Sequence, residues 1–321
     1  MRSLSVIIPN YNGEKLLREF LPSVLAALDN YSGPKELVLA DDCSTDPGVA
    51  TAAMLAAGRD WVRIVSAGRN GGFSAACNMG AASAGHEILF FLNNDVRLEP
   101  DYFSGFSGYF DDETVFAVAP CGFSWHDRKQ IDGVKTVSWS GGFLRFTGNI
   151  YNAALKPGGP YLSFSVQGAY FFADRAKFFL LGGFDELYSP YIMEETDLAY
   201  RALKRGWKIV YGRDFKGYHR VGSSIQSKTS RTTQVISARN RLVFTWKNIH
   251  SAPMLAWHFV CLGVRLLGLS AVQWRGFFAA LAMLGPIRRA RAAARAQAGT
   301  DDRALLDFYL PYFAALRSGM L

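Results

Sequence analysis

The sequence predicts an α/β fold in which a mainly parallel sheet is flanked by helices. In the N-terminal part, short apolar runs rich in β-branched residues alternate with segments whose apolar residues recur at helical spacing. Strands that alternate with helices build parallel sheets, because each helix returns the chain to the same edge before the next strand. Half of the 321 residues are hydrophobic, so the chain can bury one large core together with an appendage.

The expected elements can be placed in order along the chain. Strands are expected at Leu4–Pro9, Glu36–Ala40, Val62–Val65 and Glu87–Leu92, and helices at Glu14–Leu28, Val49–Ala57 and Ser74–Ser83. In the second half, a helix through about Arg205 and a strand at Lys208–Tyr211 are expected.

Polar or glycine-rich segments follow the expected N-terminal strands. They are Asn10-Tyr11-Asn12, Asp41-Asp42, Gly68–Gly72 and Asn93-Asn94-Asp95. Because parallel strands end at one edge of a sheet, we expect these segments to converge on a ligand site.

The middle of the chain, from about Cys121 to Phe172, is less regular and richer in aromatic residues. Strands and loops are expected there, and they could form a wall for a sugar or an acceptor. Interleaved aromatic residues are more often part of a core than of a binding surface. No residue in this stretch is therefore given a role.

Charge and cysteine content narrow the class of partner and the compartment. The formal charge is +8, and basic residues gather near the end at Arg288, Arg289, Arg291 and Arg295. Such a surface suits anionic partners, including nucleotide diphosphates and acidic lipids. The four cysteines have no metal-finger spacing and are expected to be free thiols in a reducing cytosol. The residues before the first expected strand do not resemble a signal peptide, so the active domain is expected to stay in the cytoplasm.

The C-terminal region is expected to be an amphipathic helical appendage. Pro253–Gln273 is apolar enough to resemble a membrane span, yet His258 and Arg265 interrupt it, and a central arginine costs about 2.5–3.5 kcal/mol on insertion. These two residues share one helical face, which favours a helix lying in the membrane interface. Aromatic residues could then lie at headgroup depth: Trp257, Phe259, Trp274, Phe277 and Phe278. Residues 253–295 are thus expected to contact the inner face of the cell membrane; packing on the main domain or on a second subunit is the alternative.

An acidic segment, Glu194-Glu195-Thr196-Asp197-Leu198, opens the helix expected in the second half. Asp197 and Arg201 are one helical turn apart and could form an intrahelical ion pair. Glu194 and Glu195 are adjacent, so their side chains are not expected to face one pocket. One of them could instead favour the positive end of the helix dipole.

Six segments occur in an order that identifies a family. They are Ser5–Asn12, Ala40–Asp46, Asn70–Gly80, Phe90–Asp95, Gly183–Glu186 with Glu194–Leu198, and His219–Ser224. Together they resemble glycosyltransferase family 2 over about residues 3–250. The resemblance implies an inverting enzyme of the GT-A fold. Its catalytic domain would cover 1–245, with a nucleotide-binding half of about 1–120 and an acceptor half of about 121–245, before the helical region 246–321.

The resemblance implies that a nucleotide-sugar donor binds in the N-terminal half. The implied contacts are Pro9, Asn10, Tyr11, Asn12, Asp41, Asn70, Gly71, Gly72, Asn78, Asn93 and Asn94. Asp41 falls where the family contacts the nucleotide base, and a carboxylate can accept a hydrogen bond from uracil or thymine. Its alternative role is that of a turn residue, because the run 41–46 is also ordinary turn chemistry.

The resemblance also implies a divalent cation at Asp95 and His219. A cation that bridges diphosphate oxygens stabilises the charge that develops as the glycosidic bond breaks. The carboxylate of Asp95 suits Mg2+ or Mn2+, and the nitrogen of His219 favours Mn2+. Asn93 stands where the family often has aspartate. Its amide can bind a ribose hydroxyl but adds no charge, so a modest metal affinity is expected.

The acidic segment of the second half is expected to supply the general base. One carboxylate within reach of the acceptor hydroxyl suffices, and direct displacement of the diphosphate inverts the anomeric configuration. Alignment to the family pattern favours Glu195 first, Glu194 second and Asp197 third.

Two patterns that would indicate other reactions are missing. Leu4–Gly13 contains no GxGxxG, so hydride transfer is disfavoured. Gln273-Trp274-Arg275 differs from the QxxRW segment of the family's processive synthases, so transfer of a single sugar is favoured.

These observations predict an enzyme of cell-surface polysaccharide synthesis. The expected donor is a UDP- or dTDP-sugar, with rhamnose favoured by resemblance to bacterial surface-polysaccharide enzymes. The expected acceptor is a hydroxyl of a glycan or of a lipid-linked acceptor, and nucleic acid is not an expected partner. A homo-oligomer is compatible with the sequence. The alternative, motivated by Asn93, is a non-catalytic nucleotide-sugar-binding or scaffold protein.

Overall fold

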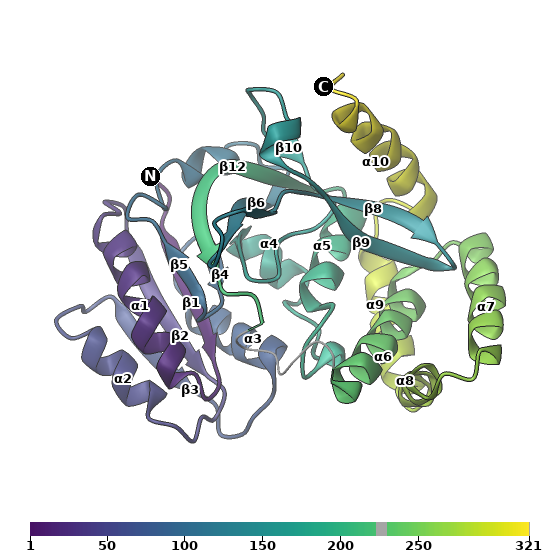
Figure 1. Cartoon of the computed structure of the whole chain (residues 1–321), viewed down its shortest axis with the longest axis horizontal. Helices are drawn as coiled ribbons and strands as arrows, with labels where there is room; N and C mark the ends of the chain where they lie inside the picture. The colour runs from purple at the N-terminus through teal and green to yellow at the C-terminus, as the bar shows by residue number, and fades with distance from the viewer. Residues whose placement is uncertain (223–229, 321) are drawn as a thin grey trace.

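The computed structural model describes residues 1–222 and 230–320. Figure 1 shows the N-terminal strands and helices on one side of the molecule and the C-terminal helices on the other. The long β8–β9 hairpin extends from the middle towards the C-terminal helices.

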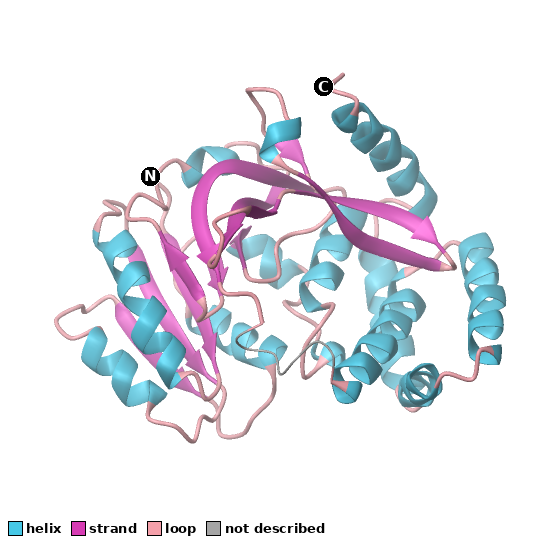
Figure 2. Cartoon of the chain, in the orientation of Figure 1, coloured by secondary structure: helices cyan, strands magenta, loops and turns pink. Residues whose placement is uncertain are grey.

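The N-terminal half alternates strands and helices as predicted. Its strands are β1 Leu4–Asn10, β2 Lys35–Asp41, β3 Val62–Ser66 and β4 Ile88–Leu92, and its helices are α1 Glu14–Asp29, α2 Gly48–Leu55 and α3 Phe73–Ser83. These strands are parallel, in the order β4-β1-β2-β3. Val6 and Ile8 of β1 pack in the cluster that contains α1, whereas Ile7 packs in the cluster that contains Cys77 of α3. Helices therefore cover both faces of this part of the sheet (Figure 2).

The second half extends the same sheet with strands of mixed direction. The added strands are β5 Val96–Leu98, β6 Val115–Ser124, β7 Gln130–Asp132, β10 Tyr161–Leu162, β11 Tyr170–Asp174 and β12 Lys208–His219. Strand β11 is antiparallel to both β4 and β6, while β12 is parallel to β6 and antiparallel to β5. Helices α4 Arg175–Leu180 and α5 Glu194–Lys204 lie between β11 and β12 in the chain, and short 3-10 turns occupy Phe106–Phe110, Asn152–Ala154 and Glu186–Tyr188.

The aromatic middle of the chain is mostly core. Strands β8 Val134–Ser140 and β9 Phe143–Ile150 form a separate two-stranded sheet. Phe143, Tyr161 and Phe164 are buried in one cluster, and Trp139 and Phe146 pack against it. The wall that these residues could have formed is thus turned inward, where burial of their rings stabilises the fold.

The C-terminal helices share this core. They are α6 Arg231–Asn248, α7 Ala252–Leu267, α8 Ala271–Leu281, α9 Leu284–Gln297 and α10 Asp302–Arg317. Leu262, Ala280, Ile287 and Phe313 belong to the same cluster as Phe164. Within the described ranges, no helix is long and apolar enough to cross a membrane.

His258 and Arg265 of α7 share one helical face, as expected, and the structure turns that face towards the protein. His258 is 0% exposed. Trp246 Nε1 donates to His258 Nε2 at 3.0 Å, and His258 Nδ1 lies 2.8 Å from the carbonyl oxygen of Gly142. Arg265 lies over the ring of Phe143, 5.2 Å from its centre. Because both polar residues have partners inside the protein, the face that they share packs inward.

Candidate active site

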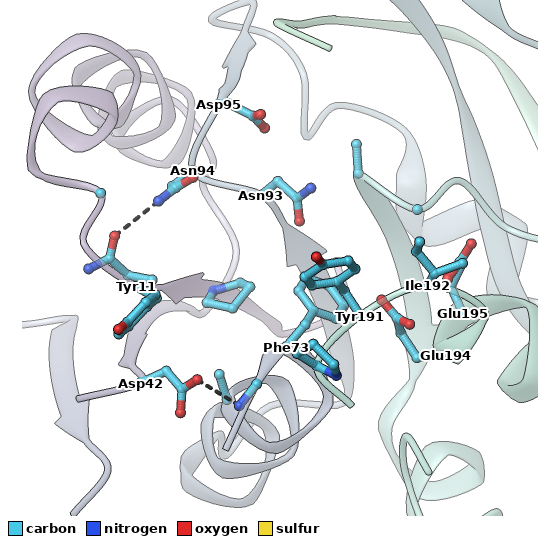
Figure 3. Close-up of a pocket in the computed structure, with 18 of the residues that line it drawn as sticks. Tyr11, Asp42, Phe73, Asn93, Asn94, Asp95, Tyr191, Ile192, Glu194 and Glu195 are labelled. Carbon is cyan, nitrogen blue, oxygen red and sulfur yellow. Dashed lines mark hydrogen bonds between the residues drawn. The ribbon is translucent and has the colours of Figure 1, made fainter. Parts of the chain in front are cut away.

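The carboxyl ends of β1, β2 and β4 open into a cleft of about 870 Å3. Asn10 links the three ends, because its Nδ2 donates to Asp41 Oδ1 at 2.9 Å and its Oδ1 accepts from Asn94 Nδ2 at 2.9 Å. The cleft is lined by most of the residues selected from the sequence, namely Pro9, Asn10, Tyr11, Asn12, Asn70, Gly72, Asn93, Asn94, Asp95, Glu194, Glu195 and His219 (Figure 3).

Asp42, rather than Asp41, lines the cleft. Both carboxylate oxygens of Asp41 are used in a turn: Oδ2 accepts from the backbone N–H of Ser44 at 3.0 Å and Oδ1 from its hydroxyl at 2.6 Å. Asp42 accepts from the backbone N–H groups of Gly71 and Gly72, both at 2.8 Å. The structure therefore favours the alternative in which Asp41 is a turn residue. Asp42 holds the loop of Gly71 and Gly72 beside the cleft.

Gly71 and Asn78 also lie outside the lining of the cleft, contrary to expectation. Asn78 Nδ2 donates to the carbonyl oxygen of Phe184 and its Oδ1 accepts from the N–H of the same residue, both at 2.9 Å. These bonds tie α3 to the second half. The side-chain amide of Asn78 thus has a structural role, because both of its polar atoms are hydrogen-bonded to the backbone of Phe184.

Asp95 and His219 are brought together by strand pairing. His219 pairs with Val96 at the end of β12, which places His219 Nε2 3.4 Å from Asp95 Oδ1. Among the described residues, no group of three or more Asp, Glu, His and Cys side chains is placed to hold a metal ion. Two protein ligands are nevertheless typical where substrate phosphates complete the coordination, so the pair fits such a cation. Ser223 and Ser224, which belong to the same sequence segment, lie outside the described residues.

A strained segment leads into α5. Ile192 and Met193 have φ angles of 79° and 84°, a conformation that costs free energy for residues with a side chain. Asn240 of α6 holds this segment, because its Nδ2 lies 3.0 Å from the carbonyl oxygen of Tyr191 and 2.8 Å from that of Ile192. Tyr191, Ile192 and Met193 line the cleft. A single asparagine in a helix carries no sequence signal for this role, so it was not predicted.

Glu194 and Glu195 both line the cleft (Figure 3), contrary to the expectation that they would diverge. Side chains of a helix tilt towards its N-terminus. Because α5 begins at Glu194, both side chains extend past the helix end into the same space.

Burial disfavours the charged form of both carboxyl groups. Glu194 is 6% exposed and its Oε2 has no hydrogen-bond partner within the described ranges. Burial and the nearby charge of Glu195 raise the pKa of Glu194 well above its ordinary value. Burial also raises the pKa of Glu195, while hydrogen bonding and the charge of Lys135 oppose the shift. Glu195 is thus the member of the pair that loses its proton more readily.

Asp197 lies outside the lining of the cleft, in a buried cluster of cations. Arg201 Nε donates to Asp197 Oδ2 at 2.7 Å, and Lys247 Nζ donates to both of its oxygens at 2.8 Å. The intrahelical ion pair expected from the sequence is present. Burial alone would raise the pKa of Asp197, but the charges of Lys247 and Arg201 outweigh it and lower that pKa. Asp197 is therefore a structural residue and not a candidate base.

A parallel N-terminal sheet that ends in a polar cleft, with an acidic pair facing it from the second half, is the arrangement of the GT-A fold. Solved structures share this fold. S. aureus TarS (residues 1–349) matches with a TM-score of 0.56 and 15% identity, over 99% of this chain and 92% of that one. GalNAc-T7 bound to UDP, GalNAc and Mn2+ matches with a TM-score of 0.62 and 18% identity, over 78% of this chain and 49% of that one.

Sequence comparison matches the N-terminal part of the chain to one family. Residues 5–162 match Glycosyl transferase family 2. The chain is 32% identical over 99 residues to the dodecaprenyl-phosphate galacturonate synthase of Rhizobium johnstonii. The matched residues make up 30% of this chain and 29% of that protein. The chain spans between 11% and 29% of the lengths of the curated relatives that it matches.

Proposed function

We propose that the protein transfers a single sugar, with inversion, from a nucleotide-diphosphate donor to an acceptor hydroxyl. The observation that carries the proposal is that the Asp95–His219 pair and the Glu194–Glu195 pair line one cleft. The first pair can hold a cation on a diphosphate, and the second can take a proton. Both functions are needed where a glycosidic bond to a diphosphate is exchanged for one to a hydroxyl.

The donor is a UDP- or dTDP-sugar, with rhamnose as the proposed sugar. Asn10, Tyr11, Asn12 and Asn70 line the nucleotide side of the cleft. Asp42, in place of Asp41, is the proposed partner of the nucleotide base. Its carboxylate also orders the backbone of Gly71 and Gly72. Such ordering fixes the loop before the donor binds, which reduces the entropy lost on binding.

Asp95 and His219 would hold Mg2+ or Mn2+. Bound there, the cation would neutralise charge on the leaving diphosphate. Asn93 lines the cleft beside them and offers an uncharged amide to a ribose hydroxyl. The solved GalNAc-T7 structure holds UDP and Mn2+, which supports this choice of ligands.

Glu195 is the proposed general base. Its carboxylate accepts the proton of the acceptor hydroxyl while that oxygen attacks the anomeric carbon on the side opposite the diphosphate, so the configuration inverts. Glu194 stays neutral beside it, because burial and the nearby charge of Glu195 both raise the pKa of Glu194. The raised pKa of Glu195 brings it closer to the pH at which a base works best.

The acceptor is proposed to be a glycan or a lipid-linked molecule in cell-surface polysaccharide synthesis. The Rhizobium relative is named for a lipid phosphate, dodecaprenyl phosphate. A peripheral contact of residues 253–295 with the cytoplasmic face of the membrane would bring the cleft to such an acceptor. Exposed apolar residues of α7 and α8, including Trp257 and Phe278, support this contact.

Calorimetric titration of the protein with UDP and with dTDP, each with and without Mn2+, tests the proposal. We expect one nucleotide to bind more tightly when Mn2+ is present, because the cation joins the diphosphate to Asp95 and His219. Asp95→Asn should remove this dependence, whereas Asp112→Asn, at an exposed ion pair outside the lining of the cleft, should keep it. If a folded sample binds neither nucleotide, the transferase proposal fails and a scaffold role gains weight.

A further inference from the structure

The outward face of α7 is apolar along the whole helix. Its exposed large side chains are Trp257, Phe259, Val260, Val264 and Leu267, and Leu269 and Phe278 lie exposed beyond it. Leu267 is 79% exposed and Leu269 is 80% exposed. A run of exposed apolar residues of this kind marks a docking surface, and Figure 1 shows α7 at the edge of the molecule opposite the N-terminal half.

Three arginines gather at the inner edge of this helix. A Cβ atom added at Gly141, at the tip of the β8–β9 hairpin, would lie 3.5 Å from one guanidinium nitrogen of Arg265 and 3.7 Å from one of Arg145. Arg241 of α6 lies near enough for the charges of Arg145 and Arg265 to lower its pKa, in addition to the larger effect of burial. Arg145 and Arg265 therefore meet at the hairpin tip beside the apolar face, and Arg241 is within range of their charges.

The cluster has no anionic partner in the described part of the chain. Acids of the neighbouring helices are used elsewhere, because Asp197 pairs with Arg201 and Lys247 and Asp302 pairs with Lys204. The Nε of Arg265 is buried and has no hydrogen-bond partner within the described ranges. Arginine stays protonated at neutral pH, so the three groups repel one another until an anion binds.

We propose that Arg145, Arg241 and Arg265 bind the phosphate of a membrane lipid whose hydrocarbon chain lies along the outward face of α7. Guanidinium groups form bidentate hydrogen bonds with phosphate oxygens. Arg265 belongs to the same helix as Val264 and Leu267, so one helix offers both the charged and the apolar contact. The exposed residues Arg275 and Arg288 add attraction to an anionic surface.

The proposal rests on the membrane contact proposed above and names the residues that make it. Arg241 follows Asn240, whose amide holds the segment that leads to Glu194. One helix, α6, therefore contributes both to the proposed lipid site and to the support of the segment before the acidic pair.

Vesicle flotation tests the site without donor or turnover. The wild-type chain should float with phosphatidylcholine vesicles that contain phosphatidic acid and much less with phosphatidylcholine alone. Each of Arg145→Gln, Arg241→Gln and Arg265→Gln should weaken binding about fivefold, as expected for one basic side chain at an anionic surface. Arg303→Gln, which removes an exposed charge of α10, should change vesicle binding little.

The apolar contact is tested separately. The double variant Val264→Asn with Leu267→Asn should weaken vesicle binding, because it alters the apolar face and leaves the three arginines in place.

Several outcomes would overturn the proposal. It fails if the arginine variants bind vesicles like the wild type, or if Arg303→Gln weakens binding as much as they do. It fails as a membrane site if the variants lose only their affinity for inorganic phosphate. Loss of repulsion should leave the melting temperature of the variants unchanged or raise it, so a lower value in all three would indicate a purely structural role. The same variants should bind the donor nucleotide like the wild type. Nucleotide titration therefore distinguishes failure of the lipid site from failure of the transferase proposal.

Discussion

Two sides of the first turn of α5 treat the same chemical group in opposite ways. Glu194 and Glu195 face the cleft, and burial raises the pKa of both. Asp197, in the same acidic run, is fully buried and bonded to Arg201, Lys247, Asn248 and Tyr188. Two acids are thus kept where ionisation is unfavourable, while the third is ionised and neutralised.

The difference separates reactivity from stability within one helix. A carboxylate that has all its partners cannot take a proton from a substrate at neutral pH, because its pKa is too low. A carboxyl group that is shielded from water and has few partners can take that proton, but its ionised form destabilises the fold. Acidic residues that look alike in the sequence therefore have different roles, which depend on the side of α5 that they occupy.

The largest expected effect is on catalysis. Glu195→Gln should lower kcat by about a hundredfold to ten-thousandfold, the contribution typical of a positioned general base, and should leave the affinity for the donor nucleotide unchanged. Turnover of the donor sugar measures the first and calorimetry the second. Glu186→Gln, at an exposed position of the same region, is the matched control. If Glu195→Gln turns over normally while Glu194→Gln does not, the base is Glu194.

Asp197→Asn should chiefly lower stability. The substitution leaves Lys247 and Arg201 buried beside a neutral group, and loss of one partner of a buried ion pair costs about 3–5 kcal/mol. Because the folded-state pKa of Asp197 is lowered, its contribution is present above the unfolded pKa of about 4 and is lost at more acidic pH. Urea unfolding gives the change in the free energy of unfolding. Asp112→Asn, at an exposed ion pair, should cost at most about 1 kcal/mol, and an equal loss in both variants would contradict this account.

Local pattern predicted the N-terminal half well. The strand Leu4–Pro9 was predicted and β1 is Leu4–Asn10, and the helix Glu14–Leu28 was predicted and α1 is Glu14–Asp29. These elements were predictable because each one buries an apolar face that recurs at its own period. The convergence of their polar ends also followed, since parallel strands leave the chain at one edge.

Direction in space was harder to predict. Spacing showed that His258 and Arg265 share a face of α7, but not that Gly142 and Trp246 would supply partners on the inner side. The same limit applies to Asp41 and Asp42, where only the end of β2 decides which carboxylate reaches the cleft. Asn240 had no pattern at all, because its partners are backbone carbonyls of a distant loop.

The smallest expected effect is a gain in stability at Glu194. Because the folded-state pKa of Glu194 is raised, the folded protein binds a proton more strongly than the unfolded chain between the ordinary and the raised pKa, and stability falls as pH rises through that range. Glu194→Gln removes this loss. Above the raised pKa it should melt a few degrees higher than the wild type, roughly the shift produced by 1 kcal/mol.

Thermal unfolding of Glu194→Gln at a series of pH values checks both the sign and the cause of this effect. At pH below about 4, where the carboxyl group is protonated in both states, the variant and the wild type should melt at the same temperature. Glu113→Gln, at an exposed position, should show no gain at any pH. A Glu194→Gln variant that melts lower than the wild type at neutral pH would mean that this carboxylate, like Asp197, is stabilised by its surroundings, and the contrast between the two sides of α5 would no longer hold.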